Sequence, residues 1–290
     1  KDFIKTLIGG MAMASLQPFY NWTKDLKEED EKLPVLFIGH GSPMNGIEDN
    51  EFSRTWMKFG NEIPKPKAVL VISAHWLTNG THITAMNNPK TIHDFGGFPQ
   101  ALFDVQYPAK GNPELAKLTS DLITTTQVGL DHEWGLDHGT WTVVRHMYPN
   151  ADIPVLQLSI DYNKPPQYHF DLAKQLQSLR KKGVLIIGSG NMVHNLGMVA
   201  WDKLQESAYG FDWAIEMNQI FKEKIGNRDF QSLIQYEKLN AAAKLAIPTP
   251  DHYYPLLYTL ALQDNQDEIS FFNDKAVGGS LTMTSVKWGN

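Results

Sequence analysis

The chain has no cysteine among its 290 residues, which excludes disulfide bonds, thiolate nucleophiles and cysteine-based zinc sites. It also lacks an excess of positive charge, because 26 Lys and Arg stand against 32 Asp and Glu for a net charge of −6. We therefore expect no nucleic acid as a main partner. The apolar run over residues 7–16 is shorter than the ~20 residues that span a membrane, so no membrane partner is expected either. Any bound metal ion must be held by His, Asp or Glu.

The first 32 residues differ in character from the rest of the chain. A basic start and the short apolar run over residues 7–16 are typical of a secretory signal, although an amphipathic helix packed on the domain explains the same pattern. Residues 24–32 are charged and are typical of a solvated linker. We therefore predict an N-terminal segment over residues 1–32 and one main domain over residues 33–290. A cytoplasmic location is expected, or a periplasmic one if residues 1–16 belong to an export signal.

Short apolar runs alternate along the chain with segments of helical spacing, which predicts an α/β fold in a single domain. Ordinary hydrophobic content, 42%, supports a sizeable core. The predicted strands are residues 34–39, 67–74, 82–86 and 153–159, a run beginning at 183 and turning at Gly188 and Gly190, and an alternating edge strand over 280–288. The predicted helices are residues 52–60, 112–126, 142–147, 167–181, 208–225 and 255–262, and residues 91–99 and 136–141 are predicted loops.

Histidines follow several of the predicted strands. His40 and His75 come directly after apolar runs, His194 follows another run by a few residues, and His252 lies in a proline-punctuated turn before a helix. Because the carboxyl ends of parallel strands share one edge of a sheet, these side chains can converge there. Neutral imidazole is a good ligand for Zn, Cu, Fe and Ni, so the pattern predicts a metal site. Four further histidines lack such surroundings and are interpreted as structural or surface residues: His82, His132, His146 and His169.

Six short motifs occur in an order that resembles the class III extradiol ring-cleavage dioxygenases, and in particular the 4,5-DOPA extradiol dioxygenase type. The motifs are Gly39-His40-Gly41-Ser42-Pro43-Met44, Ser73-Ala74-His75-Trp76, Ile92-His93-Asp94-Phe95-Gly96-Gly97-Phe98-Pro99, Asp137-His138-Gly139, Ser189-Gly190-Asn191-Met192-Val193-His194-Asn195 and Thr249-Pro250-Asp251-His252-Tyr253. The resemblance runs from about Leu33 to the C-terminus. It implies that residues 33–290 are a single dioxygenase domain around a central, mostly parallel sheet flanked by helices.

The resemblance also implies a function and a metal site. It implies a metal-dependent enzyme that opens the aromatic ring of a DOPA-like catechol with O2, and it places His40, His75, His194 and His252 around one metal ion per chain. Better-studied members use Fe(II), and some DOPA-type members are described with zinc, so both Fe(2+) and Zn(2+) are candidates. The expected partners are a small aromatic diol and O2, and a homo-oligomer is left open.

The chemistry of a catechol limits the number of protein ligands. A catechol takes two positions on the metal and O2 a third, so about three protein ligands are needed, whereas four fixed ligands would close a tetrahedral site. We hypothesise that His40, His75 and His252 are the steadier ligands. His194 would bind zinc in a resting state and act as acid/base in turnover. Asp251 is the competing candidate for a carboxylate ligand.

Other residues of the motifs receive weaker interpretations. His138 is a candidate second acid/base or hydrogen-bond donor to substrate, or else a loop histidine paired to Asp137. His93, Phe95 and Phe98 are candidate substrate-binding residues, or else aromatic anchors of a loop. Two other functions fit the same scaffold: a zinc hydrolase, in which a metal-bound water is the nucleophile, and a non-catalytic metal-binding protein.

Overall fold

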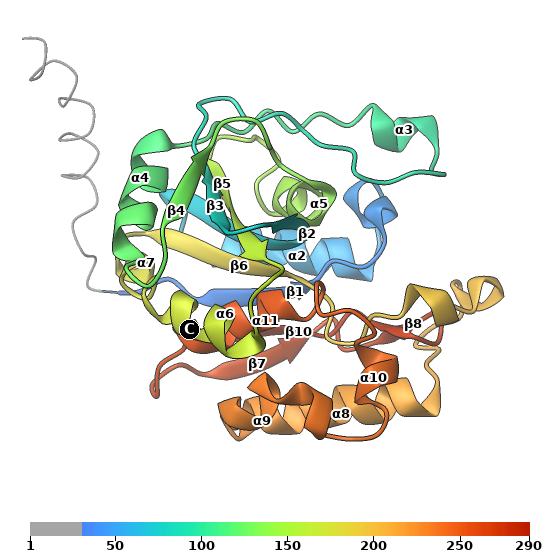
Figure 1. Ribbon diagram of the computed structural model, residues 1–290. Coiled ribbons are helices and arrows are strands. Elements are labelled where there is room, and N and C mark those ends of the chain that lie inside the picture. The colour runs from blue at the N-terminus through green and yellow to red at the C-terminus, as the bar shows by residue number, and fades with distance from the viewer. Residues whose placement is uncertain (1–30) are drawn as a thin grey trace, which may run out of the picture.

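The computed structural model describes residues 31–290 (Figure 1), so the segment expected to be either an export signal or a packed amphipathic helix lies outside that range. Its centre is an eight-stranded sheet in the order β4-β3-β5-β2-β6-β1-β10-β7. The strands are β1 (Val35–Gly39), β2 (Ala68–Thr78), β3 (Thr81–Thr84), β4 (Val128–Asp131), β5 (Val155–Asp161), β6 (Val184–Gly190), β7 (Ile269–Phe272) and β10 (Ser285–Trp288). β8 (Ala276–Val277) and β9 (Leu281–Thr282) form a separate two-stranded ribbon.

The middle of the sheet is parallel and its margins are mixed. β1, β6, β2 and β5 pair in parallel, and β3 pairs in parallel with β4 but antiparallel with β5. On the other side β10 runs antiparallel to both β1 and β7. The predicted single α/β domain with a mostly parallel sheet is therefore confirmed. The predicted edge position of the last strand is wrong, because β7, which the sequence patterns did not reveal, covers β10.

Helices cover both faces of the sheet (Figure 1). α2 (Glu51–Glu62) and α5 (His138–Met147) pack on one face, and α6 (Pro166–Lys174) and α11 (Tyr254–Leu262) pack on the other. The remaining helices are α3 (Gln100–Phe103), α4 (Pro113–Leu122), α7 (Ser178–Lys181), α8 (Asp212–Gly226), α9 (Phe230–Ile234) and α10 (Ala243–Ala246). Within residues 31–290 no helix is long and apolar enough to cross a bilayer.

The apolar runs form strands because both faces of the sheet are covered. In β1 the side chains of Val35 and Phe37 join the core below α11, whereas Leu36 and Ile38 join the core below α5. All four are fully buried, as the alternation of a strand between two helical layers requires. This packing fixes where each central strand ends, and so fixes the position of the residue that follows it.

Several boundaries differ from those predicted. β2 runs to Thr78 rather than ending at residue 74, so that His75 lies inside the strand. α5 begins at His138, four residues before the predicted helix, because the side chain of Asp137 caps it by accepting the Thr140 N–H at 3.1 Å. The predicted helix over residues 167–181 is two helices, α6 and α7. The short strand β4 falls just past the predicted end of the helix over 112–126.

Candidate metal centre

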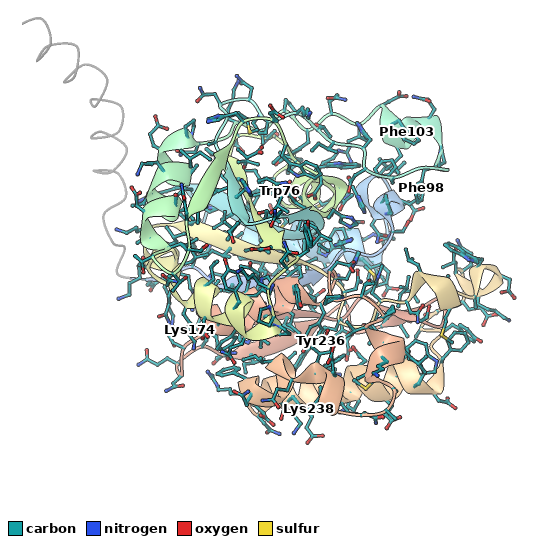
Figure 2. The ribbon with its side chains drawn as sticks, viewed as in Figure 1. Trp76, Phe98, Phe103, Lys174, Tyr236 and Lys238 are labelled. Atoms are coloured by element: carbon teal, nitrogen blue, oxygen red, sulfur yellow. The ribbon has the colours of Figure 1, made fainter. Side chains whose placement is uncertain are left out.

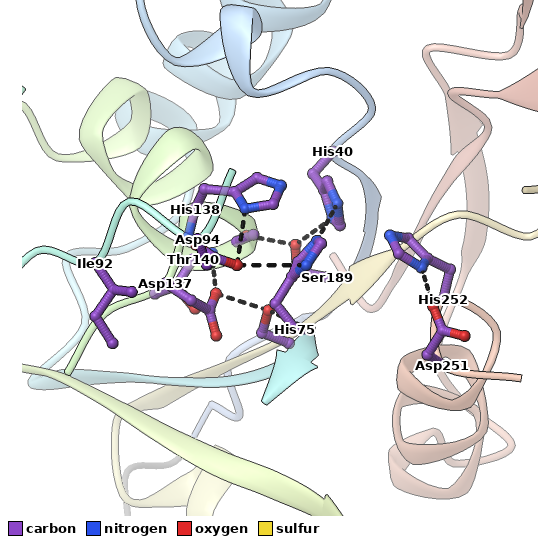
Figure 3. Close-up of polar contacts among 12 residues, drawn as sticks. His40, His75, Ile92, Asp94, Asp137, His138, Thr140, Ser189, Asp251 and His252 are labelled. Carbon is purple, nitrogen blue, oxygen red and sulfur yellow. Dashed lines mark hydrogen bonds and ion pairs between the residues drawn. The ribbon is translucent and has the colours of Figure 1, made fainter. Parts of the chain in front are cut away.

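Three histidines that the sequence singled out, His40, His75 and His252, lie together at the carboxyl edge of the parallel strands (Figure 3), and His194 lies against one of them. The ring centroids of His40 and His75 are 5.0 Å apart, and that of His252 lies 5.3 Å from His40 and 5.0 Å from His75. The ring of His194 stacks on His252 with centroids 3.5 Å apart and planes within 6°. One cluster therefore contains His40 after β1, His75 in β2, His252 in the turn before α11 and His194 after β6.

His40 follows the last residue of β1 and is held by β6. Its Nδ1 lies 3.0 Å from Ser189 Oγ, and that hydroxyl donates its hydrogen to the carbonyl oxygen of Gly139 at 2.5 Å. A hydroxyl has one hydrogen, so Ser189 must accept from His40 Nδ1–H. The proton of the neutral His40 ring is thereby fixed on Nδ1, and the lone pair is left on Nε2.

His75 lies where β2 departs from regular pairing, since its register against β5 shifts between Ile72 and Leu77. Its Nδ1 is 3.4 Å from Asp94 Oδ2. Burial would raise the pKa of the Asp94 carboxyl, but its hydrogen bonds with His138 outweigh burial and lower it. The ionised carboxylate can only accept, so from this position it favours the form of His75 with hydrogen on Nδ1 and a lone pair on Nε2.

The two lone pairs face each other, with His40 Nε2 and His75 Nε2 3.1 Å apart. Burial is the main cause that lowers the pKa of both imidazoles well below the usual value, so both are neutral at pH 7. Two acceptors at this distance repel each other unless a cation lies between them. Two nitrogens at about 2.0–2.1 Å from one metal, with ligand angles of about 90–109°, are separated by about 2.9–3.4 Å. The donor set therefore fits a metal ion.

His252 is oriented in the same way by a neighbouring acid. Its Nδ1 donates to Asp251 Oδ2, and Asp251 lies on the far side of the ring from His40 (Figure 3). Burial would raise the pKa of the Asp251 carboxyl, but hydrogen bonds with His252 and Thr249 hold it below the usual range. His194, Asp251 and His252 offer ligand atoms within 4.8 Å of one another. The contact with Nδ1 nevertheless favours Asp251 as the residue that orients His252, rather than as a ligand.

His194 is anchored by its backbone while its ring is left free. Its N–H donates to the Ala246 carbonyl at 2.8 Å, and it forms a β-bridge with Leu281. Within residues 31–290 no side chain or carbonyl is hydrogen-bonded to its imidazole nitrogens. Burial, and then the neighbouring His252, lower the pKa of His194 to about 3, so the ring is neutral at pH 7. A neutral, half-buried and unpaired imidazole is suited to a mobile ligand or to proton transfer.

His138 is the first residue of α5 rather than part of a loop, and it pairs with Asp94. Its backbone N–H donates to Asp94 Oδ1 at 2.9 Å, and its Nδ1 lies 3.0 Å from Asp94 Oδ2, although the N–H is out of line with that oxygen. Its ring centroid is 3.8 Å from His75. His40, His75 and His138 offer nitrogens within 4.8 Å of one another. His138 is therefore close enough to be a ligand, a role that the sequence did not suggest for it.

A buried polar network lies beneath the histidines. Asp137 accepts hydrogen bonds from Ser73 at 2.7 Å and from Gln157 at 2.6 Å, and burial raises the pKa of its carboxyl. Ser73 precedes His75 in β2, and Asp137 caps α5, so the network ties the two elements together. No role was predicted for Ser73 or Gln157 from the sequence. The signal was present in Gln157, a polar residue within an apolar strand, which must find a partner when buried.

Residues 93–103 form an aromatic arm that carries Phe98 and Phe103 (Figure 2). Phe95 lies edge-on to His138 with centroids 5.5 Å apart, and Phe98 and Phe103 pack on Phe95 at 5.5 and 5.1 Å. The ring of His93 bonds to the backbone just beyond the arm, because its Nε2 donates to the Val105 carbonyl at 3.0 Å. Of the three predicted substrate-binding residues, Phe95 is therefore the one in contact with a histidine of the cluster, and His93 anchors the arm.

A separate hollow of about 500 Å³ lies beyond the turn that carries Asp251. Its walls include Tyr236, Lys238, Pro250 and Tyr254. None of these residues belongs to the histidine cluster, and the hollow has no part in the chemistry considered below.

Known proteins resemble this chain over nearly its whole length. The sequence profile described as the catalytic LigB subunit of aromatic ring-opening dioxygenase matches residues 34–282. A protein of Escherichia coli K12 named 4,5-DOPA dioxygenase extradiol is 46% identical over 270 residues, which cover 92% of this chain and 98% of that protein. A protein of Beta vulgaris with the same name is 35% identical over 90% of this chain and 98% of that protein.

A solved structure supports the same relationship. The crystal structure of an uncharacterized protein from Escherichia coli K12 superimposes with a TM-score of 0.77 at 41% identity. The match covers 89% of this chain and all of that chain, 100%.

Proposed function

The chain belongs to the LigB family of aromatic ring-opening dioxygenases, and from that membership we propose that it opens the ring of a DOPA-like catechol by extradiol cleavage with O2. The observation that supports the proposal most strongly is the approach of His40 Nε2 and His75 Nε2 to 3.1 Å, with Ser189 and Asp94 beside the two Nδ1 atoms. The catalytic domain is proposed to cover residues 33–290, and the metal is proposed to be Fe(2+) or Zn(2+), one per chain.

His40, His75 and His252 are proposed as the steadier ligands. Each has its Nδ1 engaged by a neighbour, respectively Ser189, Asp94 and Asp251, so that each can present Nε2 as the ligand atom. When bound, the metal ion would hold the two oxygens of the diol beside O2 and favour the deprotonated diol. Three protein ligands leave coordination positions for the diol and O2, whereas four fixed ligands would close the site.

His194 is proposed to transfer protons. Its ring has no side-chain hydrogen-bond partner within residues 31–290 and lies against His252, so its nitrogens are free to take a proton from the diol and return it later. His138 is the proposed second proton carrier, because its Nδ1 lies 3.0 Å from Asp94 Oδ2 and its Nε2 is left for substrate. Phe95 and Phe98 would orient the aromatic ring and exclude water from the side of the aromatic arm.

The test is oxygen uptake by protein reconstituted with Fe(II) under anaerobic conditions. We expect one O2 consumed per molecule of DOPA or catechol, with formation of a ring-opened semialdehyde acid. The His194→Asn variant should retain bound metal and lose about 10²- to 10⁴-fold in kcat. The matched control is His132→Asn, which removes an exposed histidine outside the cluster and should leave kcat unchanged.

Two outcomes would contradict the proposal. Hydrolysis of esters by the Zn(II)-loaded protein, without O2 uptake by the Fe(II)-loaded protein, would favour a hydrolase. Metal binding without either activity would favour a metal-binding protein. His40→Ala should abolish metal binding, and full metal occupancy in that variant would show that the ligand assignment is wrong.

A further inference from the structure

Asp94 contacts two histidines of the site, although no role was predicted for it from its sequence motif. Its Oδ2 lies 3.0 Å from His138 Nδ1 and 3.4 Å from His75 Nδ1, and its Oδ1 accepts the backbone N–H of His138 at 2.9 Å (Figure 3). One carboxylate thus reaches a strand histidine, a helix histidine and the first N–H of α5. The side chain of Asp94 is only 18% exposed, so water competes little for these contacts.

The position of Asp94, 3.4 Å from His75 Nδ1, favours one nitrogen of that ring as the metal ligand. A carboxylate accepts hydrogen bonds only, so it stabilises the form of His75 that carries hydrogen on Nδ1 and a lone pair on Nε2. That lone pair is the one directed at His40. Carboxylates that receive the N–H of a ligating histidine orient the ring and raise its strength as a ligand.

We propose that Asp94 is a positioning residue of the metal centre, which holds His75 in its Nδ1–H form and keeps His138 beside it. The inference rests on the proposed metal site. It adds a residue for which the sequence predicted no role, and which touches neither the substrate nor the metal in the proposed site.

The same residue connects the aromatic arm to the metal centre. Asp94 stands between His93, which anchors the arm to Val105, and Phe95, which packs on His138. A displacement of the arm by a bound ring would therefore move the carboxylate that orients His75. Metal affinity and the position of the arm are expected to be coupled through this one side chain.

The experiment compares Asp94→Asn and Asp94→Glu with wild type. The amide introduced by Asp94→Asn can turn its NH2 toward His75, which would favour the tautomer with hydrogen on Nε2 and remove the ligand lone pair. Zn(II) affinity, measured by competition with a chromophoric chelator, should fall about 10- to 100-fold in Asp94→Asn. Asp94→Glu retains a carboxylate and should recover most of the affinity. The control is Asp104→Asn, an exposed acid near the arm whose side chain is bonded to Gln100 and to no histidine.

A second readout needs no metal. Nitrogen-15 NMR of histidine-labelled, metal-free protein should show His75 with hydrogen on Nδ1 in wild type and Asp94→Glu, and a shift toward Nε2–H in Asp94→Asn. Unchanged Zn(II) affinity and an unchanged tautomer in Asp94→Asn would overturn the inference. Equal losses in Asp94→Asn and Asp94→Glu would also overturn it, because the effect would then be one of packing. If wild type binds no metal, the proposed function fails, and the tautomer measurement still decides the role of Asp94.

Discussion

Replacing Ser189 with alanine tests whether its hydroxyl holds the proton of His40 on Nδ1. The hydroxyl of Ser189 lies between His40 Nδ1 and the Gly139 carbonyl, and it bonds to both. In Ser189→Ala the N–H of His40 and the oxygen of Gly139 both lose this partner in a buried site. Each buried polar group without a partner costs about 1–3 kcal/mol, so the loss of partner for two groups should lower the free energy of unfolding of the metal-free protein by about 2–6 kcal/mol.

The effect on metal binding follows from the tautomer. Without Ser189 the proton of His40 is no longer held on Nδ1, and the Nε2 lone pair that faces His75 is no longer fixed. The loss of such a supporting hydrogen bond typically lowers metal affinity about 10- to 100-fold, or about 1.4–2.7 kcal/mol. Chelator competition at pH 7 measures this change directly.

Ser53→Ala is the matched control for Ser189→Ala. Ser53 is also buried, and its hydroxyl also accepts an N–H, from Asn50 at 3.0 Å, and donates to carbonyls, of Glu48 at 2.8 Å and of Asn50 at 3.2 Å. It contacts no histidine of the cluster, so this variant should lose stability without losing Zn(II) affinity. If Ser189→Ala binds Zn(II) as tightly as Ser53→Ala does, the hydrogen bond from Ser189 does not set the ligand form of His40, and the reasoning is refuted.

Three further predictions concern residues around the core and the site. Arg180 and Asp267 form a buried bidentate ion pair with N–O distances of 2.7 and 3.0 Å. Because Arg180→Met leaves the Asp267 charge buried without its partner, it should lower the free energy of unfolding by about 3–5 kcal/mol in urea titrations. A loss below about 1 kcal/mol would contradict this. Burial lowers the pKa of His169 from 6.5 to about 4, so the unfolded chain binds the proton first and stability should fall by about 2 kcal/mol between pH 7 and pH 5. In His169→Gln that part of the pH dependence should disappear from the same titrations. A Cβ at Gly139 would lie 2.5 Å from Ser73 Oγ, so Gly139→Ala should lower the melting temperature and weaken Zn(II) binding, and unchanged values would show that α5 can shift freely.

The strands that are buried on both faces of the sheet could be predicted from the sequence. The central strands are covered on both faces, so they are continuous apolar runs, and that pattern alone locates β1 and β6. β7 and β4 were missed because they are short marginal strands whose residues are half-buried and show no clean alternation. The predicted start of α5 is too late because its first turn is His-Gly-Thr-Trp, a sequence without helical periodicity that Asp137 caps.

The convergence of the histidines could be predicted because it depends on topology, but their partners could not. The parallel pairing of β1 and β2 with β6 places His40 and His75 at one edge whatever their side-chain contacts are. The contacts of Asp94 depend on how the loop over residues 91–99 folds back on α5, and no pattern in the sequence encodes that path. Ser189 belongs to one of the six motifs, yet its role appears only when Gly139 and His40 are seen on either side of it.

Anomalous diffraction at the zinc edge, from crystals of the Zn(II)-loaded protein, tests the central claim most directly. We predict one ion per chain, within about 2.0–2.1 Å of the Nε2 atoms of His40 and His75 and of a nitrogen of His252. An ion bound elsewhere, or clear density for His40 and His75 at their present separation with no ion between them, would contradict it.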